Sequence, residues 1–260
     1  MYVDERLTTE QIATRLGRAG TTIRRRLREF RIPTRARGPI VRRRELSTPT
    51  VWTSQLGYVV GLIATDGNLS RDGRHLTIPS IDRSLLESVR TCLGLTNTIC
   101  RQWKNGRHLI YRLQWGDRSF YDWLRSIGLT PAKSRTLPAL SVPDNCFADF
   151  LRGCIDGDGA ILRYTDRYHA RKNALYVYDR LYVNLVSASP AFLEWIQATV
   201  TRLIGVRGVI NVNRKSAHGL LYALRYAKRE SIRVLRWIYY APDVPCLTRK
   251  RAKALPFLLA

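Results

Sequence analysis

One short pattern occurs twice in the sequence, and this duplication constrains the fold more than any other feature. Residues 57–70 read GYVVGLIATDGNLS, and residues 149–162 read DFLRGCIDGDGAIL. When the copies are aligned on Asp66 and Asp158, each runs from an apolar, helix-like segment into an Asp-Gly pair. Self-similarity of this kind indicates an architecture built from copies of one supersecondary unit.

The same order of elements follows each copy. Alternating and amphipathic runs predict a polar hairpin, a helix, a second hairpin and a second helix after each motif. Each series ends near a lysine, Lys133 in the first and Lys250 in the second. The sequence therefore predicts an α+β fold of two pseudo-symmetric αββαββα repeats with antiparallel sheets, over residues 47–140 and 141–260.

Charge indicates the class of partner. The 260 residues include 44 Lys+Arg against 20 Asp+Glu, a formal net charge of +24. Such an excess favours a polyanion, and we expect nucleic acid, because no apolar run approaches the roughly 20 residues that cross a bilayer. The N-terminus lacks the apolar region of a signal peptide. Five scattered cysteines without a CxxC pair favour an intracellular protein, in the cytoplasm, nucleoid or an organelle, with neither a zinc site nor a disulfide framework.

Small residues mark one face of each motif helix. They stand four apart in two pairs, Gly61 with Thr65 and Gly153 with Gly157. Small-xxx-small faces let two helix backbones approach closely. We therefore expect helices 53–66 and 144–158 to pack together as a seam between the repeats, with Asp66 and Asp158 meeting at their C-terminal ends.

Two carboxylates at negative helix ends would repel a phosphodiester unless a divalent cation reverses the sign. Mg²⁺ or Mn²⁺ suits such a site, because hard cations take oxygen ligands and activate water. Asp156 and Asp158 stand two apart, about 200° around a helix, so only one can face the seam. Asp66 matches Asp158, whereas Ala64 matches Asp156. We assign Asp66 and Asp158 as catalytic metal ligands and expect Asp156 to be a supporting or solvent-facing residue that points away from the seam.

The two motifs and the repeated element order resemble the signature of LAGLIDADG homing endonucleases in their single-chain, two-repeat form, over about residues 50–255. The resemblance implies a monomer, with no protein partner, that binds a long asymmetric site on double-stranded DNA. It implies cleavage of both strands with short 3′ overhangs, and Ca²⁺ binding that does not support cleavage.

The resemblance also implies site residues. The final aspartate of each motif is the metal ligand in the family, and we add the backbone oxygens of Thr65 and Gly157 as ligands. Family enzymes use a basic residue near each active site, for which Lys133 and Lys250 are the candidates. Ala64 departs from the signature.

Two alternatives stay open on the same scaffold: a catalytically inactive DNA-binding regulator and an intron maturase. No intein splicing residues frame the chain, which favours a free-standing or intron-encoded protein.

Polar side chains alternate along the predicted hairpins, whose exposed faces would form a saddle on DNA as in the family. Strand side chains in the major groove can read base edges, although each one is equally compatible with phosphate contact or plain solvation. The candidate contacts are Asn68, Ser70, Arg74, His75, Thr77, Arg101, Trp103, Arg112, Gln114, Arg163, Tyr164, Arg167, Tyr176, Tyr178, Arg180, Tyr182, Asn184, Asn211, Asn213, Arg214, Arg225 and Tyr226.

A separate module is predicted at residues 1–46. Thr8 or Thr9 can cap a short helix, a turn follows at residues 17–20, and a second threonine cap starts a helix in TTIRRRLREF. The pattern resembles a helix-turn-helix, which places its second helix in the major groove; a plain basic two-helix extension is the alternative. Residues 35–44 would be a basic tether. The predicted DNA contacts are Arg24, Arg25 and Arg28, and the predicted apolar residues are Ile12, Ala13, Leu16, Ile23 and Leu27.

Overall fold

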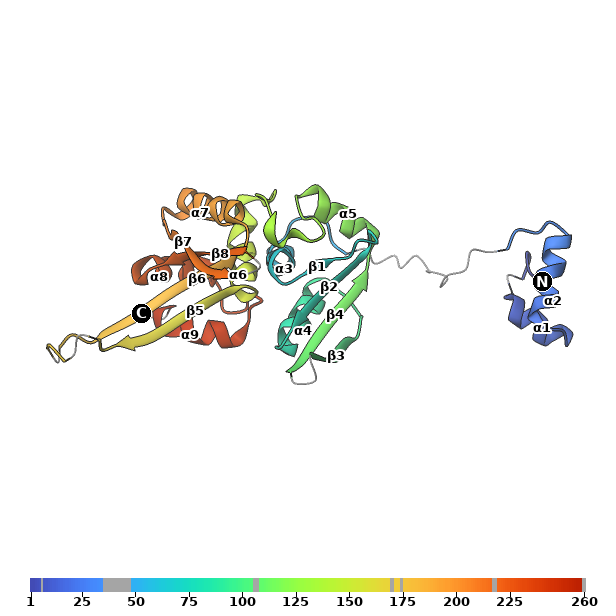
Figure 1. Ribbon diagram of the computed structural model, residues 1–260, viewed down its shortest axis with the longest axis horizontal. Helices are drawn as coiled ribbons and strands as arrows, with labels where there is room; N and C mark the ends of the chain where they lie inside the picture. Colours follow the sequence, from blue (N-terminus) through green and yellow to red (C-terminus); the bar gives the residue numbers. More distant parts are fainter. Residues whose placement is uncertain are drawn as a thin grey trace. The chain divides into compact units, whose positions relative to one another are not determined.

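The structure is a computed structural model, and contacts within it divide the chain into two units, Met1–Leu46 and Ser47–Ala260 (Figure 1). The predicted tether at residues 35–44 lies outside the described residues. Those residues are 1–5, 7–34, 48–104, 108–168, 171–173, 175–216 and 219–258. Among them, no helix is long and apolar enough to cross a membrane.

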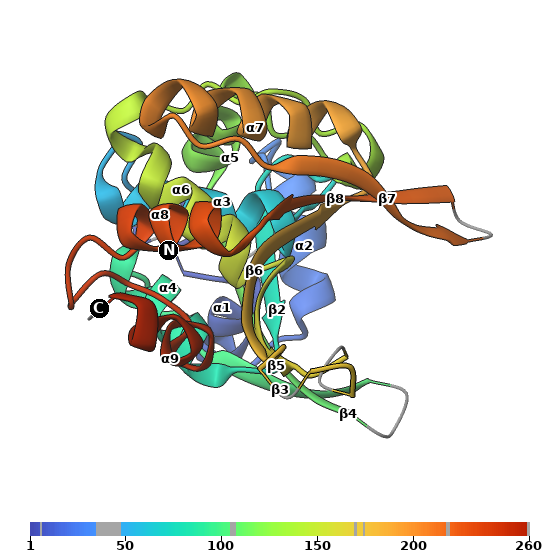
Figure 2. The same ribbon diagram turned by 90° about the vertical axis from the view of Figure 1, so that its left-hand side faces the viewer.

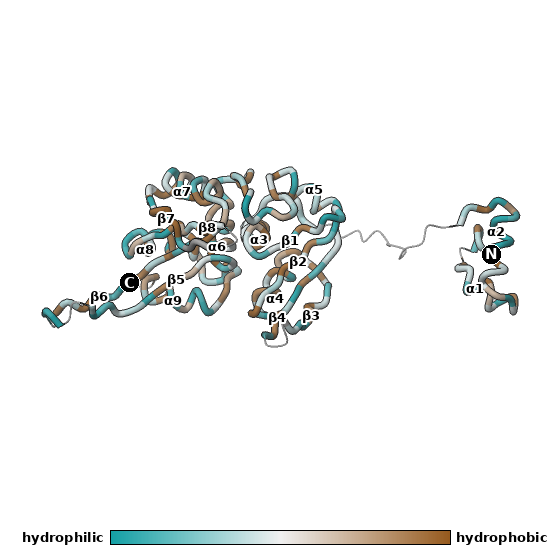
Figure 3. Tube along the Cα trace, in the orientation of Figure 1, coloured by the Kyte–Doolittle hydropathy of each residue, from teal (hydrophilic) through white to brown (hydrophobic). Residues whose placement is uncertain are grey.

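The described part of the first unit contains two helices, α1 (Thr9–Leu16) and α2 (Gly20–Glu29). Thr8 caps α1 through a reciprocal capping box with Gln11. The predicted threonine cap of α2 is wrong: the helix begins at Gly20 after Ala19, which makes no side-chain cap bond, so the threonines fall in the first turn. Most of α2 is hydrophilic (Figure 3). Its small core holds Ile12, Ala13, Ile23 and Leu27.

Leu16 was expected in that core, but 50% of its surface is exposed. It is the last residue of α1, where the chain turns away at Gly17 in the left-handed conformation (φ 58°).

The first repeat begins with the motif helix and forms one antiparallel sheet with strand order β1-β2-β4-β3. The first strand has only two residues. The elements are α3 (Ser54–Thr65), β1 (Asn68–Leu69), β2 (His75–Ser80), α4 (Arg83–Cys92), β3 (Ile99–Lys104), β4 (His108–Gly116), α5 (Arg118–Ser126) and the 3₁₀ turn η1 (Lys133–Arg135).

The second repeat has the same order of elements, and its sheet has the equivalent strand order β5-β6-β8-β7. It ends in an extra helix that the sequence did not predict, α9 (Thr248–Leu258). The other elements are the 3₁₀ turn η2 (Asp144–Cys146), α6 (Phe147–Asp156), β5 (Gly159–Asp166), β6 (Tyr178–Ser187), α7 (Pro190–Ile204), β7 (Val209–Ser216), β8 (Gly219–Tyr226) and α8 (Lys228–Ile238).

The two sheets share the register of strand pairing as well as the order of strands. Thr77 of β2 pairs with Gln114 of β4, and the matching residue of β6, Asn184, pairs with Arg225 of β8. Helices cover one face of each sheet (Figure 2): α4 contacts β2 and β4, and α7 and α8 contact β6 and β8. The other face carries exposed side chains. The predicted α+β fold of two antiparallel repeats is confirmed.

Candidate active site

The two motif helices touch along their glycines. A Cβ atom on Gly61 would lie 2.1 Å from the carbonyl oxygen of Phe150, and a Cβ on Gly153 would lie 2.1 Å from that of Tyr58. Real Cβ atoms do not approach backbone so closely, so only glycine permits this separation. The helices α3 and α6 therefore pack backbone to backbone, which fixes the relative position of their C-terminal ends.

The two aspartates follow from these helix ends. Asp66 is the C-cap residue of α3, and Asp158 follows the end of α6 by two residues. The ends are adjacent, because a Cβ on Gly157 would lie 2.1 Å from Thr65 Oγ1 and 3.2 Å from Asp66 Oδ2.

Burial raises the pKa of Asp66 to about 6. The charge of Asp158 adds to this rise, whereas Lys250 and Lys133 oppose it. Partial desolvation also raises the pKa of Asp158, against the same two lysines. The Asp158 side chain is exposed, whereas that of Asp66 is half-buried.

Both candidate lysines are buried and donate to matching carbonyls. Lys133 Nζ donates to the carbonyl oxygen of Gly67, and Lys250 Nζ donates to that of Gly159 at 2.7 Å. Gly67 and Gly159 each directly follow a motif aspartate. Lys250 donates further to the carbonyls of residues 155, 156 and 157 at 2.6, 2.7 and 3.1 Å, where α6 leaves its last carbonyls without intrahelical partners.

Burial lowers the pKa of both lysines, to about 8 for Lys133, while the nearby carboxylates oppose this change. Among the aspartates of the motifs, the larger attraction on Lys133 comes from Asp158. For Asp66 the larger attraction comes from Lys250. The carboxylate that most raises the pKa of Lys250 is Asp156, in its own repeat.

Two pockets flank the helix ends, one at each aspartate. The Asp66 pocket has a volume of about 270 Å³ and includes residues 79–82, Gly157 and Arg249. The Asp158 pocket has a volume of about 240 Å³ and includes Thr65, Ser134, Leu137 and residues 186–188.

The two linings correspond under the repeat symmetry at the aspartate, the strand end and the motif-helix end, whereas the residues from the lysine-bearing segments differ. Each pocket takes its aspartate and a strand end from one repeat, and a motif-helix end and part of the lysine-bearing segment from the other. Both pockets are thus composite, and neither repeat forms one alone.

The available donors fit a hard divalent cation. Asp66 and Asp158 supply carboxylates, and the ends of the motif helices supply backbone carbonyls at Thr65 and Gly157. The Gly157 carbonyl already accepts from Lys250 at 3.1 Å, which leaves one of its two lone pairs. The described residues contain no group of three or more His, Cys, Asp or Glu side chains that could hold a metal. Mg²⁺ needs only one or two carboxylates when waters and substrate phosphates complete its shell.

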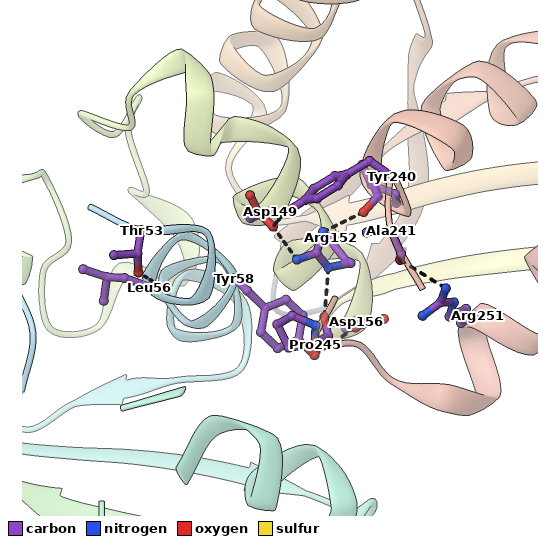
Figure 4. A network of polar contacts seen from close by, with 11 residues as sticks. Thr53, Leu56, Tyr58, Asp149, Arg152, Asp156, Tyr240, Ala241, Pro245 and Arg251 are labelled. Carbon is purple, nitrogen blue, oxygen red and sulfur yellow. Dashed lines mark hydrogen bonds and ion pairs between the residues drawn. The ribbon is translucent and has the colours of Figure 1, made fainter. Parts of the chain in front are cut away.

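Asp156 differs from the prediction. Its side chain is 2% exposed, and its Oδ2 accepts from Tyr58 Oη at 2.9 Å (Figure 4). The same oxygen accepts from the Leu247 backbone N–H at 2.7 Å. Tyr58 lies on α3, so Asp156 bonds across the seam and also holds the start of the α9 segment. The predictions that Asp156 faces solvent and points away from the seam are wrong, because α3 and the chain around Leu247 cover the end of α6. Its supporting role fits these contacts.

A buried arginine completes this network, and sequence reasoning missed it. Arg152 is 0% exposed. Its Nε donates to the Pro245 carbonyl at 2.8 Å, and its Nη2 pairs with Asp149 (Figure 4). Its Nη1 donates to the Ile238 carbonyl at 2.6 Å. The available signal was an Asp-x-x-Arg pair inside an otherwise apolar motif helix. The network anchors α6 to the segment that carries Lys250.

The open faces of the two sheets carry most of the predicted nucleic-acid contacts. Arg101, Trp103 and Arg163 are exceptions, because the strand register places them on the helix-covered faces, and the Arg163 guanidinium lies 5.2 Å from the centre of the Phe257 ring of α9. In the first sheet, Asn68, Thr77 and Gln114 lie side by side across β1, β2 and β4. The prediction that Tyr226 contacts nucleic acid is wrong, because its side chain lies in the core and is only 2% exposed. The side chain of Arg214 is outside the described residues. The remaining candidates are exposed or half-buried: Ser70, Arg74, His75, Arg101, Trp103, Arg112, Arg163, Tyr164, Arg167, Tyr176, Tyr178, Arg180, Tyr182, Asn184, Asn211, Asn213 and Arg225.

The second sheet is the more aromatic of the two. The Arg225 guanidinium lies 3.7 Å from the centre of the Tyr182 ring, which stacks on Tyr164 with 6.3 Å between ring centres. Arg180 pairs with Asp166 at 2.9 Å and lies 5.0 Å from the Tyr178 ring centre. These contacts place both arginines beside tyrosine rings on the open face.

In the separate N-terminal unit, acids already pair with two of the three predicted contact arginines. Arg24 pairs with Glu10, and Arg25 lies 3.7 Å from Glu29. Arg28 is exposed on α2.

Comparison with known proteins gives structural neighbours only. No protein-family model and no curated protein matches the sequence. The LAGLIDADG homing endonuclease I-LtrWI, bound to target DNA, matches with a TM-score of 0.52 at 12% identity, over 78% of this chain and 89% of that one. I-DmoI in complex with DNA and Ca matches with a TM-score of 0.49 at 16% identity, over 76% and 96%.

A third neighbour is full-length DUF199/WhiA from Thermatoga maritima, with a TM-score of 0.48 at 10% identity over 78% of this chain. The chain spans 60% of the length of that protein. The two four-stranded antiparallel sheets and their helices thus match the two-repeat LAGLIDADG fold, here with a second unit, Met1–Leu46, in the same chain.

Proposed function

We propose that the chain is a metal-dependent DNA endonuclease that hydrolyses one phosphodiester bond on each strand, with one acid from each repeat. The observation that carries the proposal is the pair of composite pockets at the ends of α3 and α6, each with an aspartate and a lysine-bearing segment at matching positions. A helix cap needs no such duplication, whereas two cuts on antiparallel strands need two equivalent sites.

In this proposal Asp66 and Asp158 hold the cation, with the carbonyls of Thr65 and Gly157 as further ligands. A divalent cation supplies an acidified water and neutralises charge on the attacking and leaving oxygens. In the reaction a water oxygen bonds to phosphorus, one ester bond breaks, and the departing oxygen takes a proton.

The lysines have a positioning part in the proposal. Lys250 binds four carbonyls at the end of α6, which holds Asp158 and Gly157 in place. Both ammonium groups offset carboxylate charge before a cation binds. At neutral pH Lys133 remains protonated, because its pKa is about 8.

DNA is the partner that the charge and the sheets support. The net charge of +24 attracts a polyanion. The exposed faces present Asn, Gln and Arg side chains, which suit base edges in the major groove. I-LtrWI, which shares the fold, binds target DNA. In this proposal the N-terminal helices add a second DNA contact through α2.

The test is cleavage of a plasmid library that carries a long randomised duplex insert, with Mg²⁺ and the full chain. We expect a recurrent asymmetric site cut on both strands with short 3′ overhangs, and no cutting in EDTA or Ca²⁺. Selective binding of a DNA site without cutting in Mg²⁺ or Mn²⁺ would instead indicate a regulator and refute the endonuclease.

A further inference from the structure

The two pockets are equivalent in position but unequal in charge. Arg249 lines the Asp66 pocket. The described lining of the Asp158 pocket contains neither arginine nor lysine. This difference bears on the two strands of the substrate, because each pocket would serve one strand in the proposed function, on which this inference rests.

The difference arises in a clamp that occurs in both repeats. Asp82 precedes α4, and its Oδ2 accepts a hydrogen bond from Arg249 Nε at 3.1 Å and forms an ion pair with Nη2, also at 3.1 Å. At the matching position before α7, Ser189 Oγ donates to the Leu137 carbonyl at 2.7 Å. Each clamp ties one repeat to the lysine-bearing segment of the other. Only the first clamp adds a cation, because the second uses a backbone carbonyl.

Arg249 is placed to bind an anion in addition to Asp82. Its side chain is 53% exposed, and that of Asp82 is 23% exposed. Exposed ion pairs contribute little to stability, so Asp82 does not hold the guanidinium tightly. A guanidinium has five N–H donors in a fork that matches phosphate, and Asp82 Oδ2 accepts a hydrogen bond only from the Nε donor. The neighbouring Lys250 is buried and bound by carbonyls, so Arg249 is the cation that faces this pocket.

The corresponding segment of the first repeat offers no equivalent. The arginine of this segment, Arg135, is exposed. Its Nη2 lies near Gly219 at the start of β8, 4.0 Å from the position that a Cβ atom on that glycine would take. That position belongs to the β7–β8 hairpin, whereas Leu221, further along β8, is the residue that lines the Asp158 pocket.

We propose that Arg249 contacts the scissile phosphate of one strand only, so that the two strands are cut at unequal rates. The strand in the Asp66 pocket gains a guanidinium contact to the charge that develops on phosphate, and the strand in the Asp158 pocket lacks it. Nicked duplex with one particular strand cut is then the first product.

The experiment measures single-turnover cleavage of a site selected from the library, with a different dye on each strand, in Mg²⁺. Arg249→Met should slow one strand by about tenfold or more, leave the other within about twofold of wild type, and change the balance of nicked product. Lys253→Met removes an exposed positive charge from the same helix, and we expect it to leave the strand ratio unchanged. Asp82→Asn keeps Arg249 but weakens the clamp, and it should not slow that strand.

Three results would overturn the inference while leaving the endonuclease intact. The first is equal slowing of both strands in Arg249→Met, which would mean a general role in binding or folding. The second is the same strand defect in Asp82→Asn, which would mean that the clamp alone matters. The third is an unchanged strand ratio in a folded Arg249→Met protein. Failure of the wild type to cut any selected site would refute the proposed function itself, and this inference with it.

Discussion

Replacing Asp66 with asparagine should make the metal-free protein more stable at neutral pH. Burial and the charge of Asp158 raise the Asp66 pKa from an ordinary 3.8 to about 6. This rise corresponds to at most about 3 kcal/mol of destabilisation once the carboxylate is ionised, because one pKa unit is worth about 1.4 kcal/mol. Solvent at the half-buried side chain reduces this value.

The sign follows from proton binding. At about pH 3.5 the carboxyl is largely protonated in both the folded and the unfolded chain, so Asp66→Asn should change little. As pH rises through about 4 to 6, the unfolded chain releases its proton before the folded chain does, and the wild type loses stability relative to the variant. Above about pH 6 the full difference is present, and the variant should melt up to about 10 °C higher.

Thermal denaturation in EDTA at about pH 3.5 and about pH 7.5 measures this difference. Asp243→Asn is the matched control, because it removes an exposed acid from a protein of net charge +24 and should be neutral or slightly destabilising. Mg²⁺ should stabilise the wild type but not Asp66→Asn, since binding to the folded state alone raises stability. A variant less stable than wild type at about pH 7.5 in EDTA would refute the account of a strained, desolvated carboxylate at the helix end.

Three other substitutions or deletions test the architecture. Gly153→Ala places a Cβ 2.1 Å from a backbone oxygen, so it should lower the melting temperature and abolish cleavage. The control Gly73→Ala lies in open space at φ 76° and should cost only about 1–2 kcal/mol of stability. Equal melting temperatures for the two variants would contradict the close seam. Asp156→Ala should destabilise the folded protein by about 1–3 kcal/mol, because it leaves the Tyr58 hydroxyl and the Leu247 N–H without their acceptor. Asp156→Asn should recover most of that loss. Equal stability of the two variants in denaturant unfolding would argue against these two hydrogen bonds. Deleting residues 1–46 removes thirteen arginines and five acids, so DNA binding should weaken and its salt dependence should become shallower. Titration at several salt concentrations measures both. An unchanged affinity and salt slope would exclude this unit as a DNA contact.

Much of the fold could be predicted because the sequence contains two copies of the same structural repeat. Glycine at Gly61 and Gly153 has a steric reason that sequence spacing expresses directly, and the order of hairpins and helices repeats with it. The acids Asp66 and Asp158 were assigned by the same comparison, since a position occupied by aspartate in both copies stands out against Ala64.

Features present in only one repeat were not predictable in this way. Asp156 and Arg152 have the apolar residues Ala64 and Val60 at the matching positions of the first repeat, so their burial depends on contacts with Tyr58 and Pro245 that only the folded chain supplies. The helix α9 was missed because it begins in a basic run and contains Pro256, which normally ends a helix; burial of Lys250, Ala254 and Phe257 stabilises it.

The sequence also could not predict that each pocket is lined by residues from both repeats. Each pocket combines the aspartate of one repeat with the motif-helix end and part of the lysine-bearing segment of the other repeat. Pairing across a pseudo-twofold seam depends on which loop returns to which helix end, and spacing along one chain carries no information on this.

The most direct test of the central claim compares Asp66→Asn and Asp158→Asn with the wild type on a library-selected DNA site. The account predicts that each variant binds the site in Ca²⁺ with nearly wild-type affinity, because the sheets that contact DNA are unchanged. It predicts that each variant loses cleavage in Mg²⁺ by at least about a hundredfold, the order of loss seen when one charge-stabilising group is removed. Cleavage at the wild-type rate by either folded variant would contradict a catalytic centre assembled from one acid of each repeat.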